Sequence, residues 1–248
     1  VMGALILCAL AVTVAHESKV RTKLSTCSST GCVQHLLFTE AATYGLPSAF
    51  KLLNTVYREK PSYRGECSGM FAAAIAKNAF SRDVDFTHYD LTPAIATCNY
   101  GFIQQYAETL ITMTADPARA QAFCSLLVRA IGSQVPGAEA ECYRSVGKGL
   151  ALAATKFSHD PVVIAATSTA HCKTLTSTED DYHTCLSGVF GSMGRLTSNN
   201  ASGLSINTAD PMSLCKSQTD REVRSRCYGN YKATVLSMIN TSDTKGSQ

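Results

Sequence analysis

Apolar residues recur at helical spacing along much of the chain, in paired segments separated by short polar stretches. Three of the pairs begin at an Asp-Pro dipeptide, at residues 116–117, 160–161 and 210–211. Aspartate before proline is typical of a helix start. The aspartate side chain accepts hydrogen bonds from free amide groups of the first turn, and proline lacks an N–H that would have no partner within the helix at this position. Each start is followed by a second apolar segment. The pattern therefore predicts a repeat of helical hairpins.

Cysteines lie near the predicted turn of each hairpin, one toward the end of its first helix and one toward the start of its second. The two helix ends that meet at a hairpin turn are close in space, which suits a disulfide. The predicted bridges are Cys124–Cys142, Cys172–Cys185 and Cys215–Cys227.

The N-terminal half has weaker repeats of the same kind. Helical segments are predicted over Gln34–Tyr44, Pro47–Glu59 and Gly69–Phe80, and Thr92-Pro93 resembles a degenerate helix start. We expect Cys32 to pair with Cys67 across this longer hairpin. Cys27 with Cys98 is then left by elimination.

The chain begins with a hydrophobic segment, Val1–Ala15, which is followed by the basic residues Lys19, Arg21 and Lys23. It fits either a signal peptide or a retained helix, and we expect a retained helix because a basic start is lacking. Fifteen residues fall short of the roughly 20 that span a bilayer, so residues further upstream would have to complete a membrane anchor. Otherwise the segment packs within an assembly.

Two polar stretches lie outside the predicted helices. We expect residues 197–210 to form an exposed loop and residues 241–248 to form a polar tail. Asn200 and Asn240 stand in glycosylation patterns within or beside these stretches. We thus expect an anchor or assembly helix over 1–23, a disulfide-rich helical repeat domain over 24–240 and the tail.

The composition indicates a cellular compartment and argues against one class of partner. Eleven cysteines in 248 residues indicate an oxidising compartment, extracellular or in the cell envelope. A mitochondrial intermembrane space fits less well, since the twin Cys-x9-Cys spacing is absent. A net charge of +3, without a basic run, argues against nucleic-acid binding.

For each group of residues that could form a reactive or metal-binding site, a purely structural interpretation is favoured. His171, Cys172, His183 and Cys185 could surround zinc, but their spacing matches no familiar zinc module, and a disulfide flanked by surface histidines is favoured. Gly147-Lys148-Gly149 lacks the rest of a phosphate-binding loop, so tight helix packing is expected there. The same is expected of Gly188, Gly191 and Gly194. Glu179–Asp181 are interpreted as a solvated turn, since their spacing does not suit calcium.

The segments Cys142-Tyr143-Arg144-Ser145-Val146-Gly147-Lys148-Gly149 and Cys185–Phe190 resemble repeated Cys-Tyr-His-Gly-x-Gly-His-Gly segments of uncharacterised exported proteins. Arg144 and Lys148 stand where that pattern has histidines, so no histidine role carries over. The resemblance implies a helical repeat.

The sequence thus predicts an all-α fold of stacked helical hairpins, stapled by disulfides and preceded by a hydrophobic N-terminal helix. The expected function is that of a non-enzymatic structural or accessory subunit of an extracellular, envelope or membrane-attached assembly, either filament-like or single-span. We expect no cofactor and no metal. Other protein subunits are the expected partners, including further copies of this chain that assemble through the N-terminal helix. A membrane is a further expected partner. The alternative is an exported binding module for a small ligand or metal.

Overall fold

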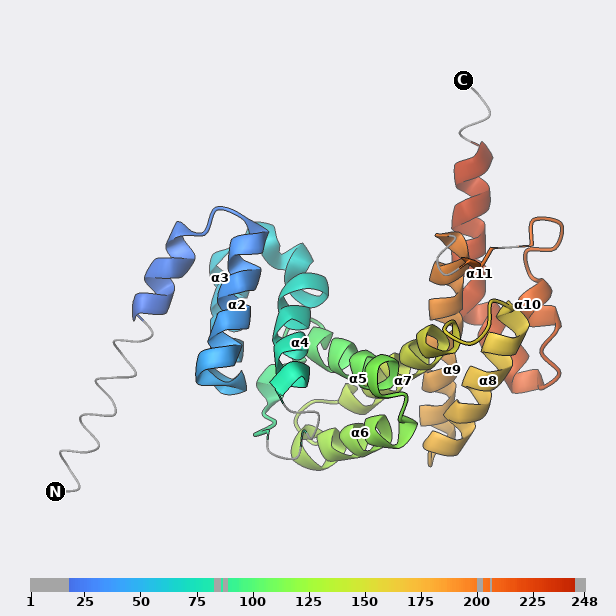
Figure 1. Cartoon of the computed structure of the whole chain (residues 1–248), viewed down its shortest axis with the longest axis horizontal. Helices are drawn as coiled ribbons and strands as arrows, with labels where there is room; N and C mark the ends of the chain where they lie inside the picture. Colours follow the sequence, from blue (N-terminus) through green and yellow to red (C-terminus); the bar gives the residue numbers. More distant parts are fainter. Residues whose placement is uncertain (1–17, 83–85, 87–88, 200–202, 206, 244–248) are drawn as a thin grey trace. The chain divides into compact units, whose positions relative to one another are not determined.

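A computed structural model describes residues 18–82, 86, 89–199, 203–205 and 207–243. All regular secondary structure within these ranges is helical, and they contain no β-strand (Figure 1). The predicted all-α class is confirmed. No helix in the described ranges is long and apolar enough to cross a membrane. The hydrophobic segment Val1–Ala15 lies outside the described residues.

The chain divides into two compact units. Unit 1 comprises residues 1–83 and 94–102, and unit 2 comprises residues 84–93 and 103–248. Helix α5 (Gly101–Thr114) begins in unit 1 and continues in unit 2. The three Asp-Pro starts all fall in unit 2.

Unit 1 opens with a helical segment over residues 18–26, which crosses the predicted domain boundary at residue 23 and buries Leu24. A sharp turn at Gly45, whose φ of 83° suits glycine, separates the next two helices. Phe50 and Phe102 meet edge-on in the core, with ring centroids 5.1 Å apart. The remaining elements are α2 (Thr30–Tyr44), α3 (Leu46–Glu59), the 3₁₀ helix η1 (Pro61–Glu66), the π-helix η2 (Cys67–Ala72), α4 (Ala73–Arg82) and the 3₁₀ helix η4 (Pro93–Ala96).

Unit 2 is built on an aromatic cluster and a row of packed helices. Phe86 and Tyr106 both pack on Phe123, at centroid distances of 5.1 and 4.8 Å. Helix α7 packs on α9, and α9 packs on α11. After α5, the helices are α6 (Pro117–Ile131), α7 (Ala138–Ala154), α8 (Pro161–Leu175), α9 (Glu179–Ser198), α10 (Ser213–Lys216) and α11 (Arg221–Asp243).

Two of the three predicted helix starts are confirmed. The carboxylate of Asp116 accepts a hydrogen bond from the Ala118 amide at 3.1 Å, and that of Asp160 accepts one from the Val162 amide at 2.8 Å. The third start is wrong, because α10 begins only at Ser213. There the Asp210 carboxylate instead accepts from Lys216 Nζ at 2.8 and 2.9 Å.

The three predicted hairpin disulfides are confirmed. They join α6 to α7, α8 to α9 and α10 to α11, with Cα atoms 5.4 to 5.7 Å apart. Each bridge links consecutive helices across their connecting loop, as the cysteine positions predict. The pairs are Cys124–Cys142, Cys172–Cys185 and Cys215–Cys227.

The two upstream pairings are wrong: Cys27 pairs with Cys32, and Cys67 pairs with Cys98. The first bond forms because helix 18–26 ends directly before Cys27 while α2 begins at Thr30, so one short turn brings the two cysteines together. The second forms because the start of α5 lies against the π-helix. A methyl group added at Gly101 would come within 2.6 Å of the Ser68 backbone.

The predicted tail and glycosylation sites are described only in part. Helix α11 extends to Asp243, three residues into the predicted tail, and 244–248 lie outside the described residues. Asn240 belongs to this helix, in a stretch where only the backbone is described. Asn200 lies outside the described residues. Glycosylation at both sites stays a prediction.

Candidate functional site

Helices α7 and α9 of unit 2 meet in a close, reciprocal glycine crossing. A methyl group added at Gly147 would collide with the carbonyl oxygen of Cys185, and one added at Gly188 would collide with that of Arg144. Each glycine faces the backbone three residues before the other glycine, so the crossing has approximate two-fold symmetry. The tight-packing interpretation of these two glycines is confirmed.

Helix α7 is also packed closely on its other side, although less tightly than against α9. A methyl group at Gly149 would approach the Ile111 side chain to 2.8 Å and the Glu108 carbonyl oxygen to 3.0 Å. The Gly-Lys-Gly stretch therefore fits α7 between α5 and α9. For Gly191 the prediction is wrong, since a methyl group there would meet no atom within 4 Å.

A charged cluster lies where these helices meet. Burial raises the pKa of Glu108 on α5, and the positive charges of Lys148 and Arg195 offset this only in part. Burial also lowers the pKa of Lys148, and the like charge of Arg195 lowers it further. Both groups are thus pushed toward their neutral forms.

A second polar cluster connects α9 to α11. Arg226 Nη2 lies 2.7 Å from His183 Nδ1, and because a guanidinium only donates, this ring nitrogen accepts. The opposite ring nitrogen, Nε2, then carries the hydrogen and lies 3.1 Å from Glu222 Oε1, without the geometry of a hydrogen bond. Arg226 Nε also donates to Glu222 at 2.9 Å. This arrangement fixes the pairing of the two helices.

The candidate zinc ligands are not brought together as a metal site. Cys172 and Cys185 are joined in a disulfide, as predicted, and cannot act as thiolate ligands. His171 is exposed, but the His183 side chain is only 15% exposed, so its expected surface position is wrong. Within the described ranges no three His, Cys, Asp or Glu side chains are arranged to hold a metal ion.

The acidic stretch at residues 179–181 forms the first turn of α9, in which Glu179 and Asp180 are exposed, as predicted, whereas Asp181 is buried. The Thr178 hydroxyl accepts from the Asp181 amide at 3.1 Å and donates to the Asp181 carboxylate at 2.6 Å. Asp181 is only 6% exposed. A threonine followed three residues later by an acidic residue is a known capping pattern, so the sequence held a signal for this start.

An apolar hollow of about 110 Å³ opens on unit 2 between the ends of α5 and α7 and the middle of α8. Phe157, in the turn after α7, lines it and is 84% exposed. The neighbouring Lys156 holds this turn in place, since its Nζ donates to the Thr112 carbonyl oxygen at 2.6 Å. The full lining is Ile111, Ala115, Pro117, Leu150, Ala153, Ala154, Phe157, Thr167 and His171. A large aromatic ring left exposed beside an apolar hollow is typical of an interaction surface.

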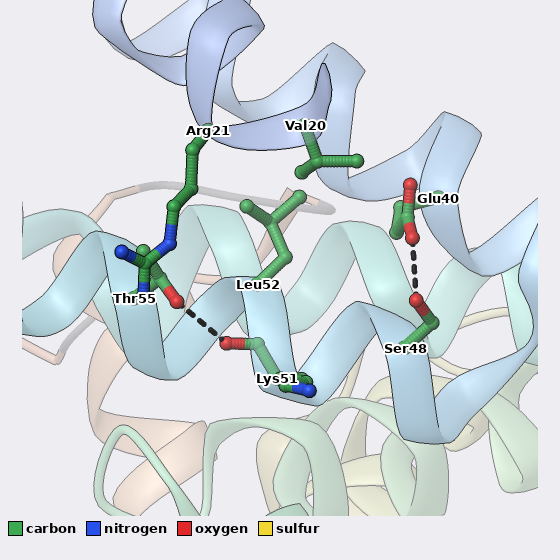
Figure 2. Close-up of a pocket in the computed structure, with 7 residues that line it drawn as sticks. All are labelled: Val20, Arg21, Glu40, Ser48, Lys51, Leu52 and Thr55. Atoms are coloured by element: carbon green, nitrogen blue, oxygen red, sulfur yellow. Dashed lines mark hydrogen bonds between the residues drawn. The ribbon is translucent and has the colours of Figure 1, made fainter. Parts of the chain in front are cut away.

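A smaller pocket lies in unit 1, between helix 18–26, α2 and α3. Figure 2 shows Glu40 of α2 pointing toward Ser48 of α3, whose hydroxyl donates to the carboxylate. Glu40 is 4% exposed, and Arg21 and Lys51 line the same pocket. Its volume of about 40 Å³ has room for only one or two waters.

Comparisons of the chain with family models, with curated proteins and with solved structures find no match.

Proposed function

We propose that the protein is a non-enzymatic structural or accessory subunit of an extracellular, cell-envelope or membrane-attached assembly, built as an array of stacked helical hairpins. The five disulfides support an oxidising compartment. The contacts of α7 with α9 and of α9 with α11 support lateral stacking, since these are the second helices of successive hairpins. Bridges across each turn make such an array rigid.

The observation that carries the proposal is the apolar hollow beside Phe157. A ring that is 84% exposed forgoes roughly 1.5–3 kcal/mol of burial, which a partner surface recovers. The partner that we propose is the hydrophobic segment Val1–Ala15 of a second copy. Fifteen residues rich in Leu, Ile and Val precede the described part of the chain, and such a segment supplies the large apolar side chains that fill an apolar hollow.

Sedimentation velocity tests this function on the full chain, on a chain lacking residues 1–17 and on Phe157→Asp. The full chain is expected to form oligomers that the truncated chain does not form. Phe157→Asp is expected to shift the distribution toward the monomer, because a buried carboxylate without a partner opposes docking. Val128→Asp is the matched control, since Val128 is an exposed apolar residue, 37% exposed, that does not line the hollow.

The outcomes separate the two parts of the proposal. If the full and truncated chains sediment alike, the N-terminal segment does not drive assembly and the function is refuted. If truncation abolishes assembly but Phe157→Asp behaves like Val128→Asp, the segment assembles without the hollow, and only the docking site is wrong.

A further inference from the structure

One disulfide differs from the other four in its exposure. Nine of the ten bonded cysteines are buried, and the six in the hairpin bridges have no exposed surface. Cys32 alone among these ten is exposed. Its partner Cys27 is 5% exposed. A dissolved thiol can therefore approach the Cys27–Cys32 bond from the Cys32 side, whereas the other sulfurs are covered.

The same bond contributes least to holding the fold together. Its cysteines are separated by 5 positions in the sequence, against 12 to 31 for the other bridges. A shorter closed loop restricts the unfolded chain less. Helix α2 is also held by its packing against α3 and α4. Opening the Cys27–Cys32 bond should therefore leave unit 1 folded.

The surroundings favour a thiolate once the bond is open. Cys32 lies in the first turn of α2, where its amide donates to the Ser29 side chain at 3.2 Å. Negative charge in the first turn of a helix is stabilised, which favours Cys32 as the leaving group when it is released from a mixed disulfide. The Lys60 ammonium donates to the Cys27 carbonyl oxygen at 3.5 Å, which places a positive charge beside the bridge.

We propose that Cys27–Cys32 is a thiol–disulfide exchange site whose substrate is a low-molecular-weight thiol. The thiolate of this molecule attacks the exposed Cys32 sulfur, the bond to Cys27 breaks, and Cys27 leaves as a thiolate that takes up a proton. A second thiol attacks the substrate sulfur of the mixed disulfide and releases Cys32. In total, one protein disulfide and two thiols give two protein thiols and one small disulfide. This activity goes beyond the structural function and does not depend on it.

Graded reduction of the oxidised full chain with reduced glutathione tests the site, with the freed cysteines alkylated and identified by peptide mapping. Cys27 and Cys32 are expected to open at least about tenfold faster than any other pair, with the helical circular dichroism retained. The proposal is overturned if another pair opens as fast, or if helicity is lost together with this bond.

Single-cysteine variants test which of the two sulfurs glutathione can reach. With oxidised glutathione, Cys27→Ser should form a mixed disulfide at Cys32 at least about tenfold faster than Cys32→Ser forms one at Cys27. Equal rates, or a faster Cys27, would refute the assignment of Cys32 as the attacked sulfur. The wild-type reduction experiment decides the proposal even if either variant fails to fold.

Discussion

Replacing Gly188 by alanine tests the helix crossing that organises unit 2. The added methyl group would collide with the Arg144 carbonyl oxygen and would come within 2.8 Å of its carbonyl carbon and 3.0 Å of the Lys148 nitrogen. All three atoms belong to the backbone of α7, so no side-chain rotation relieves the clash. Helices α7 and α9 must move apart along their contact.

Two effects of opposite sign set the size of the change. Overpacking of this kind destabilises by about 1–3 kcal/mol, and more where backbone atoms collide. Alanine also favours a helix over glycine by about 1 kcal/mol. Because separating the helices also loosens the packing around the buried Val189, the clash should win. We expect Gly188→Ala to lower the free energy of unfolding by about 2 kcal/mol.

Urea unfolding of the oxidised protein, followed by far-ultraviolet circular dichroism, measures this change. Gly191→Ala is the matched control, because it lies on the same helix and its methyl group would meet nothing within 4 Å. The control should be stabilised by up to about 1 kcal/mol. A Gly188→Ala protein as stable as the control would refute the reciprocal crossing.

Three further predictions concern charge, capping and disulfides in unit 2. Because folding raises the pKa of Glu108, stability from this group is present below its unfolded pKa and is lost as the pH rises through its folded pKa. Glu108→Gln should therefore unfold at higher urea than wild type at pH 7 and lose this advantage toward pH 4, and an unchanged difference would contradict the sign. Thr178→Ala should lower the free energy of unfolding by about 1 kcal/mol, since it removes the cap of α9, whereas Thr178→Ser should restore it. Replacing both Cys172 and Cys185 by alanine should lower the free energy of unfolding by about 3 kcal/mol. Thermal unfolding measures this change, and a midpoint equal to that of wild type would argue against the bridge.

The sequence predicted features that depend on short stretches of chain. The all-α class, two of the Asp-Pro helix starts and the three hairpin disulfides follow from local spacing, because a turn places its own flanking cysteines together. The Asp210 start failed because its helix is only four residues long. The Asp210 carboxylate accepts hydrogen bonds from Lys216 instead of capping a helix.

Apart from the tight packing at Gly147, Gly149 and Gly188, features that depend on tertiary contacts were not predicted. The Cys67–Cys98 bond requires the start of α5 to lie on the π-helix, and no local pattern reports that contact. The pattern of small residues did not distinguish Gly188, which touches α7, from Gly191, which faces open space. The hollow beside Phe157 is lined by residues of α5, α6, α7 and α8, which lie far apart in the sequence, so it was also missed.

The pairing of consecutive helices by disulfides is the central claim, and non-reducing tryptic peptide mapping tests it most directly. Trypsin can cut between the two cysteines of every hairpin bridge, at Arg129, Lys173 and Lys216 among other sites. The account predicts linked peptides that contain Cys124 with Cys142, Cys172 with Cys185, and Cys215 with Cys227. A linked peptide that joins cysteines of two different hairpins, or free thiols at these positions in the oxidised protein, would contradict it.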